Sequence, residues 1–242
     1  LVSDNGFRNH SGFDQQKIIL KNFNNIQDLS LQTLISFTNL NQETAGYINS
    51  YFYPTRIENI NPEAYRDAKS LRIKTEISRG LKKYNIYFTP YLRFSSMEFI
   101  QHYLPGKPIE KNGQKSTGLT IKLSEIEIND NFFEIGSHVE IAFINLDQFQ
   151  PDILNSPNAF NNAVRPQGYH YDFEVVTNFF AGFISHEIEL KNNYNFFSNL
   201  RLEYLNYDYD NLMSDGRLKD DGTACARGGC FYSRPEDSEL SF

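Results

Sequence analysis

Apolar and polar residues alternate along much of the chain with a period of two, as in a β-strand whose two faces meet different surroundings. Between residues 71 and 78, one face is apolar or β-branched and the other is polar or charged. The first face carries Leu71, Ile73, Thr75 and Ile77, and the second carries Arg72, Lys74, Glu76 and Ser78. We therefore predict a strand with two chemically distinct sides here.

Similar alternation predicts seven further strands, and a ninth is expected to begin near Glu236. These seven cover residues 17–23, 29–38, 85–94, 119–128, 133–143, 171–185 and 200–204. A one-residue phase shift within 119–128 predicts a β-bulge. In 171–185 we assign Tyr171, Phe173, Val175, Phe179 and Phe183 to the apolar face, and treat Val176, Phe180 and Ile184 as interruptions of the polar face.

The connections between these strands alternate strictly between short and long. Short polar links cover residues 24–28, 78–83, 129–131 and 191–195, and long links cover 41–66, 97–117, 146–170 and 207–234. A membrane barrel places short turns on the periplasmic side and long loops outside, whereas a soluble β-sandwich has no reason to sort its loops in this way. The alternation therefore indicates a membrane barrel.

The predicted fold class is all-β, an antiparallel transmembrane β-barrel of which this chain holds about eight to nine strands. Strands of about 12 residues, tilted near 40°, would cross an apolar band of about 25 Å. We expect the apolar faces to contact lipid and the polar faces to line the lumen. Aromatic residues flank the short links, as an interfacial girdle would. They are Tyr84, Phe132, Phe133, Tyr194, Phe196 and Phe197.

Composition removes several other classes of protein. With 21 Phe and 15 Tyr among 242 residues, the chain is too aromatic for a disordered protein. No apolar run approaches the roughly 20 residues of a membrane-spanning helix. The net charge of −7 argues against a nucleic-acid partner. Because no nucleophile–base pair, phosphate loop or metal-ligand spacing is identifiable, we expect neither enzymatic activity nor a cofactor or metal site.

Both ends of the chain and its two cysteines add further expectations. The first residues, LVSDNGFRNHSGFDQQ, are loop-like and lack an initiator Met or an export signal, and Phe242 follows shortly after a long link. We therefore expect a segment of a larger barrel.

Cys225 and Cys230 enclose Ala-Arg-Gly-Gly, and we expect them to form a small disulfide that rigidifies an outer loop.

Five long stretches carry a family resemblance: TNLNQETAGYI (38–48), NPEAYRD (61–67), YLRFSSMEFIQHYLPGKPIEKNGQKSTG (91–118), RLEYLNYDYDN (201–211) and DGTACARGGCFYSRPED (221–237). They resemble TonB-dependent outer-membrane receptors of the iron-complex type. The resemblance implies a barrel of about 22 strands around an N-terminal plug, with residues 1–242 forming part of the barrel wall and the plug and TonB box lying elsewhere.

The resemblance further implies a location in the outer membrane of a Gram-negative bacterium. It implies active uptake of a scarce solute, such as a ferric siderophore or another metal chelate. Expected partners are outer-membrane lipid, the protein's own plug and the TonB complex.

Two sets of candidate functional residues follow. The polar strand faces present charged side chains that could contact the plug or simply line a wet lumen: Arg72, Lys74, Glu76, Arg93, Glu134, Glu140, Arg201 and Glu203. Two segments expected in the outer loops, HYLPGKPIEKNG and QGYHYD, carry groups suited to a polar ligand or metal complex. The ligand-contact candidates are His102, Tyr103, Glu110, Tyr169, His170 and Asp172.

Two other classes of protein remain open at this stage. Eight strands could close into a passive porin or an OmpA-like barrel. The chain could also be a soluble all-β carbohydrate-binding module. The first would show a closed sheet, and the second would bury the apolar strand faces in a dry interior.

Overall fold

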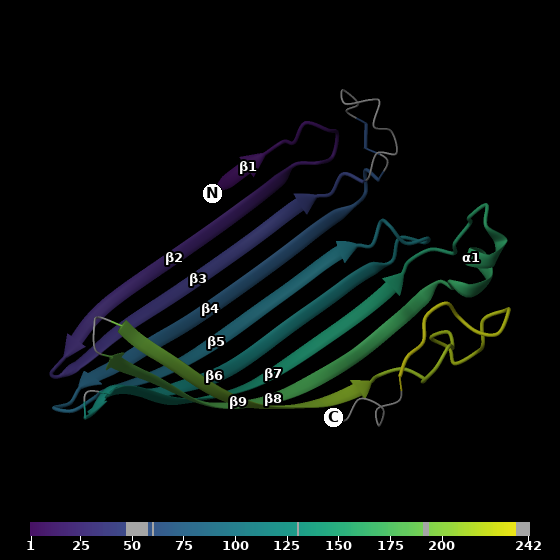
Figure 1. The fold of residues 1–242 in the computed structure, drawn as a ribbon. Helices are drawn as coiled ribbons and strands as arrows, with labels where there is room; N and C mark the ends of the chain where they lie inside the picture. The colour runs from purple at the N-terminus through teal and green to yellow at the C-terminus, as the bar shows by residue number, and fades with distance from the viewer. Residues whose placement is uncertain (47–57, 60, 130, 191–193, 236–242) are drawn as a thin grey trace.

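The computed structural model of the chain describes residues 1–46, 58–59, 61–129, 131–190 and 194–235. These residues form one antiparallel sheet in which nine strands are neighbours in chain order (Figure 1). The elements are β1 (Val2–Asp4), β2 (Phe13–Ile26), β3 (Leu29–Glu43), β4 (Tyr65–Gly80), β5 (Asn85–Ile100), β6 (Ile109–Ile128), β7 (Asn131–Gln150), α1 (Ala159–Val164), β8 (Gly168–Leu190) and β9 (Tyr194–Asn211). Among the described residues, no helix has the length and apolar character needed to cross a bilayer.

The all-β antiparallel fold is confirmed, and the sheet contains one strand that the sequence pattern did not predict. The N-terminal stretch expected to be a loop contains β1, which pairs with β2 through Val2↔Gln15 and Asp4↔Phe13. Three residues are too few for alternation to be recognised. The strand expected near Glu236 lies outside the described residues.

The pairing register joins the alternating side chains into rows that run across the sheet. One such row contains Ile35, Ile73 and Leu92, which are directly paired from β3 to β5, and the next row towards the short turns contains Leu119, Val139 and Phe180. We call the face that carries these rows the outer face. The inner face carries rows of polar and charged residues, for example the row of Arg72, Arg93 and Ser116.

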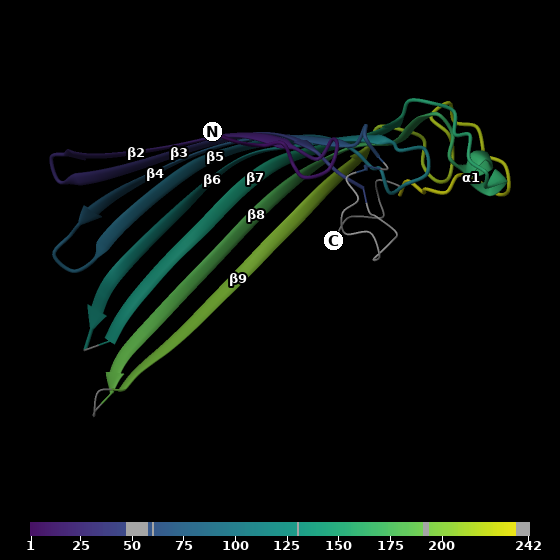
Figure 2. The same cartoon turned by 90° about the horizontal axis from the view of Figure 1, so that it is seen from above.

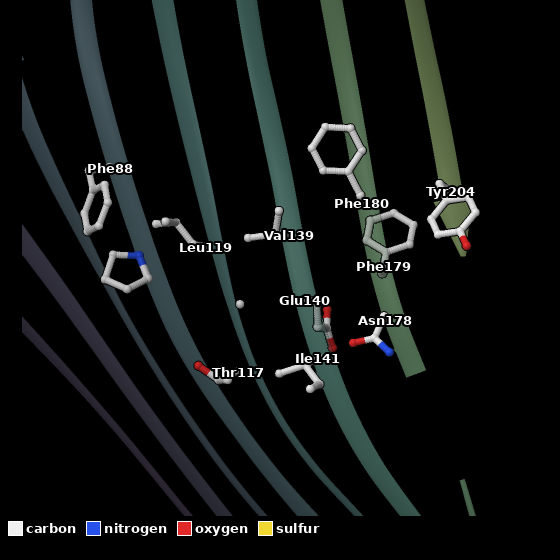
Figure 3. A pocket seen from close by; sticks show the side chains of 12 residues that line it. Phe88, Thr117, Leu119, Val139, Glu140, Ile141, Asn178, Phe179, Phe180 and Tyr204 are labelled. Atoms are coloured by element: carbon white, nitrogen blue, oxygen red, sulfur yellow. The ribbon is translucent and has the colours of Figure 1, made fainter. Parts of the chain in front are cut away.

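The outer face is apolar and uncovered. Its side chains include Phe143, which is 52% exposed, Phe180, which is 51% exposed, and Leu202, which is 70% exposed. No second layer packs on this face within the part of the chain that the structure describes. A shallow hollow of about 590 Å³ between Phe88 and Tyr204 has a largely apolar lining, although Thr117 and Asn178 project into it (Figure 3). Apolar side chains left open in this way are those of a wall that faces lipid.

The sheet is curved (Figure 2), and its inner face contains closely packed side chains. Its small residues Ser116, Ala142 and Ala181 are at most 5% exposed. A Cβ added at Gly118 would lie 2.3 Å from the ring of Tyr91, and one at Gly136 would lie 2.2 Å from the ring of Phe183. These two glycines therefore provide the space in which aromatic rings from neighbouring strands lie flat on the sheet.

The expected orientation of β8 was wrong. Glu140 pairs with Phe179 and Gly136 with Phe183, so both phenylalanines lie on the inner face. Phe180, opposite Val139, lies on the outer face, together with Val176 and Ile184. Both sides of β8 are apolar, so its own alternation contains too little contrast, and only the register with β7 determines which side faces outwards.

The predicted irregularity in β6 is confirmed. The β6–β7 register shifts between Leu123 and Ile126, where Glu125 has a φ of 57°. After this bulge, Ile126 and Ile128 return to the outer face. A second interruption occurs between β4 and β5, where the pairs stop at Lys74↔Tyr91 and resume at Ile77↔Phe88, because Pro90 has no N–H to donate.

All long connections lie at one end of the sheet and the short turns lie at the other (Figure 1), as expected. The strands are nevertheless longer than predicted, from 14 residues in β2 to 23 in β8. Much of the expected loop 97–117 belongs to β5 and β6, so the link between these strands is residues 101–108. Beyond Phe37, Leu71 and Phe94 the outer face becomes polar, and the sheet therefore extends past its apolar band on the long-loop side.

The uncovered outer face yields a direct test. Val139 lies in the central row of the apolar band, and Val139→Arg is expected to lower the free energy of unfolding by about 2–4 kcal/mol in liposomes. Thr89→Arg, on the inner face, is the matched control and is expected to change it little. Chemical denaturation of the liposome-inserted protein measures both, and equal costs for the two variants would contradict the assignment of the faces.

Candidate functional site

The centre of the inner face holds a network of polar groups from three strands, β5, β6 and β7. The Arg93 guanidinium forms an ion pair with Glu140 and donates from Nε to Ser116 Oγ at 3.1 Å. The Tyr91 hydroxyl donates to Glu140 and lies 2.7 Å from His138 Nε2. Charge-assisted hydrogen bonds of this kind hold side chains in fixed positions, so the network forms a rigid polar surface on the lumen side.

Two further ion pairs lie on the inner face of β6 to β9. Lys122 Nζ lies 2.9 Å from Glu134 Oε2, and Arg201 Nε donates to Glu203 Oε1 at 2.5 Å. The Arg201 guanidinium also lies 5.9 Å from the ring centre of Phe179. All the inner cations predicted on β5 to β9 therefore have a carboxylate partner.

The inner charges on β4 differ. Arg72, Lys74 and Glu76 take part in no ion pair among the described residues, and Arg72 lies directly opposite Arg93 in the register. The structure places all eight predicted lumen residues on the inner face. Their contact with a plug stays a prediction.

A compact cap covers the long-loop end of β7 and β8, where residues 151–167 pack against residues 212–235 (Figure 2). Phe231 N donates to Val164 O at 2.9 Å, and the Arg165 guanidinium lies 4.0 Å from the Phe231 ring centre. Cys225 and Cys230 form a disulfide and are almost fully buried with Tyr232 in the core of the cap. Residues distant in sequence are thereby held as one unit.

Arg234 is the main polar link within the cap. This side chain is 2% exposed, and its guanidinium donates to Ser214 O at 2.6 Å, to His170 O at 3.0 Å and to Leu218 O at 2.8 Å. Backbone hydrogen bonds also join Arg234 to Gly216 in both directions. The carbonyl oxygens compensate the buried charge. Through its bond to His170 O, Arg234 also ties the chain after β9 to β8.

We expected His170 to lie in an exposed loop, but the structure buries it, with 1% of the residue exposed. It belongs to the cap end of β8, beyond the apolar band, where its ring stacks on Tyr232 at 4.5 Å and Nε2 lies 2.8 Å from Pro166 O. Burial, together with the charges of Arg165 and Arg234, lowers the pKa of His170. The neutral ring is therefore a structural group of the cap and is unavailable to a ligand.

The other ligand-contact candidates are dispersed along the rim. His102 and Tyr103 lie in the loop 101–108, with their ring centres 5.7 Å apart and Tyr103 well exposed. Glu110, expected in a loop, lies in β6 and accepts from Gln101. Tyr169 and Asp172, likewise expected in a loop, belong to β8. Among the described residues, no hydrogen bond or ion pair joins His102 or Tyr103, Glu110, and Tyr169 or Asp172 to one another. The role of these residues as ligand contacts stays a prediction.

Sequence patterns did not identify the residues that build the cap. Arg234, Gln150 and Tyr232 are at most 5% exposed, yet they lie at strand ends or in irregular segments where no period exists. The signal that could have found them was the disulfide, because a covalent ring in a long loop predicts a local core around it.

Taken together, these features define a segment of a β-barrel wall, with one apolar face, one charged face and a structured cap. The backbone is similar to the crystal structure of the ferric citrate transporter FecA in the unliganded form, with a TM-score of 0.65 and 12% identity. The match covers 85% of this chain and 31% of FecA, so the chain spans about a third of that protein. This match confirms that the described strands have the fold expected for a segment of a receptor-type β-barrel wall.

At the level of sequence, no family model matches the chain, and neither does any curated protein. The likeness to FecA therefore establishes the fold of this segment. FecA is a transporter, and the described sheet of this chain is open, with β1 and β9 at its two edges. The closed eight-stranded barrel that remained possible from the sequence is not what the described residues form.

The role of Arg234 can be tested in the cap. Arg234→Lys keeps the charge but loses the planar set of donors, and we expect local unfolding of residues 214–219 to become easier by about 2 kcal/mol, which is roughly a 30-fold faster hydrogen exchange. Arg227→Lys, at an exposed position elsewhere in the cap, should leave the hydrogen exchange of residues 214–219 unchanged. Unaltered exchange in Arg234→Lys would show that the carbonyl contacts do not hold this segment.

His170 makes the cap sensitive to acid. The pKa of His170 is lowered in the folded cap. As the pH falls below about 6.5, His170 of the unfolded cap therefore gains a proton that the buried ring of the folded cap does not accept. The stability of the cap should therefore decrease as the pH falls from about 6.5 towards the lowered pKa. Hydrogen exchange of residues 230–234, corrected for intrinsic rates, is expected to accelerate at pH 5 relative to pH 7.5. His170→Gln should remove most of this dependence, and equal protection of the native cap at both pH values would contradict it.

Proposed function

We propose that this chain is part of an outer-membrane receptor that takes up a scarce solute with energy supplied by the TonB complex. The observation that carries the proposal is the division of one sheet into an uncovered apolar outer face and a charged inner face, with every long connection at the same end. A wall of this kind separates lipid from a polar lumen. The fold shared with a ferric citrate transporter supports an uptake function of the same kind.

The proposed cargo is a ferric siderophore or a similar metal chelate. The chain would contribute one part of the barrel wall, and the plug that gates the lumen would lie in another part of the polypeptide. The inner network around Tyr91, Arg93 and Glu140 offers fixed donors and acceptors at the lumen surface, which suits docking of a folded plug. The loop 101–108 and the cap would belong to the surface that first meets the solute outside the cell.

The cap supports selective capture better than passive flow. An open pore requires only that its outer loops do not obstruct diffusion, whereas a binding site gains affinity when its loops are held in place before the ligand arrives. Here a disulfide, a buried arginine and a stacked histidine hold residues 212–235 against β8. Phe231 joins the same segment to Val164 and Arg165. This preorganisation favours the receptor over a porin.

Uptake by cells that produce the full-length protein tests the proposal. With radiolabelled iron supplied as ferric citrate or as ferric hydroxamate chelates, we expect saturable uptake of at least one chelate that a protonophore abolishes. A host that lacks TonB should behave like the protonophore-treated cells. Uptake of small solutes that is linear in concentration and insensitive to both treatments would instead identify a passive channel.

A further inference from the structure

Lysines mark the boundary of the apolar band on the outer face of β4 to β6. Lys115 lies in the last apolar row, paired with Phe94 on one side and Phe143 on the other. Lys69 lies one row further towards the long loops, opposite Ser96. Both side chains are exposed, and both are long enough to keep an ammonium group at the polar edge while their stems cover apolar surface.

Two adjoining hollows meet at these lysines. The lower hollow, nearer the short turns, has a volume of about 230 Å³ and is lined by Phe37, Leu71 and Phe94. The upper hollow, nearer the long loops, has a volume of about 410 Å³ and is lined by polar groups that include Lys111 and Asn145. The residues that line both are Lys69, Ser95, Ser96, Gln114 and Lys115. We call the surface formed by Lys69, Ser96 and Lys115 the basic basin.

The charges around the basic basin leave its lysines without a counter-charge. Lys111, in the next row, lies 3.5 Å from Glu98, and Glu98 also accepts from Tyr65. Asp67 lines the upper hollow in that same further row. Lys69 and Lys115 take part in no ion pair with any residue that the structure describes. The basin therefore presents two cations directly above an apolar floor.

The same boundary has the opposite charge on the neighbouring strands. On the outer side of β8 and β9, the corresponding rows carry Glu174, Asp208 and Asp210. The net charge of the chain is −7, so the positive charge at β4 to β6 is local. A ligand attracted by charge would therefore bind at the basin rather than along the whole edge of the band.

We propose that the basic basin binds the phosphate group of a lipid in the leaflet on the long-loop side, with the acyl chains lying on Phe37, Leu71 and Phe94. Ammonium groups bind phosphate oxygens through charge-assisted hydrogen bonds, and the Ser96 hydroxyl lies between the two lysines to add a further donor. The apolar floor and the cationic rim are in the order in which a membrane lipid presents its chains and its headgroup. This inference rests on the proposed function, which places the outer face in a membrane.

The test uses the full-length receptor, purified in an uncharged detergent. Bisphosphorylated lipid A and its dephosphorylated form are titrated separately, and bound lipid is counted by native mass spectrometry. Each lysine near a lipid phosphate strengthens binding about fivefold, so we expect the phosphorylated lipid to bind roughly 25-fold more tightly. The double variant Lys69→Gln/Lys115→Gln should remove this preference.

A matched control carries two lysines at the other end of the sheet. Lys82→Gln/Lys83→Gln, in the short turn between β4 and β5, should retain the wild-type preference. Equal binding of both lipids to the wild-type protein, or an equal loss in both double variants, would overturn the proposal. Displacement of the lipid by an equal concentration of inorganic phosphate would also overturn it, because it would define a site for a free anion.

The outcomes separate this inference from the function on which it rests. A full-length protein that folds as a soluble monomer without detergent would refute the membrane receptor and the basin together. A membrane-inserted receptor with energy-dependent uptake but no preference for the phosphorylated lipid would refute the basin alone.

Discussion

The antiparallel hydrogen-bond ladder is the constraint on which the rest of this structure depends. In a lipid environment every backbone N–H and C=O must be paired within the protein, and the register that pairs them also aligns side chains into rows across eight long strands. One set of rows is then mainly apolar and includes Ile35, Ile73 and Phe180, and the other set carries most of the charges. Lipid contact on one side and a polar lumen on the other are consequences of that single register.

The inner face uses the same register to organise its polar groups. Tyr91 lies flat over Gly118 because no side chain occupies that position on the neighbouring strand, and its hydroxyl thereby reaches Glu140 and His138. Arg93 completes the network. Arg93, Lys122 and Arg201 each pair with a carboxylate within the wall, whereas Arg72 and Lys74 on β4 have no such partners among the described residues.

The cap is stabilised by a different kind of interaction. Residues 151–167 and 212–235 contain little regular structure, so their backbone groups need other partners. The buried Arg234 guanidinium is such a partner for three carbonyl oxygens. A short disulfide and the His170–Tyr232 stack form the packed core beside it. The long connections most distant from the membrane therefore include an ordered surface. On the receptor hypothesis this surface would receive the solute, while the outer rim of β4 to β6 would contact lipid headgroups.

The sequence by itself determined eight of the nine described strands, their antiparallel order and the end to which the connections between them belong. Period-two alternation is a local property, and loop length is read directly from the chain, so the faces of β3 to β7 and the bulge near Glu125 were predictable. The disulfide was also expected, because only one pairing of Cys225 with Cys230 is available. The lumen positions of Arg93, Glu140 and Arg201 followed from the same alternation.

Only the tertiary structure decided the rest. The orientation of β8 depends on its register with β7, since both of its faces are apolar. The strands extend beyond the apolar band because neighbouring polar segments pair with each other, a gain that no single segment reveals. His170 became a buried structural group, and Arg234 a link between distant segments, because irregular loops pack through specific contacts rather than through a periodic pattern. Long-range packing therefore determined the cap, whereas local chemistry determined the wall.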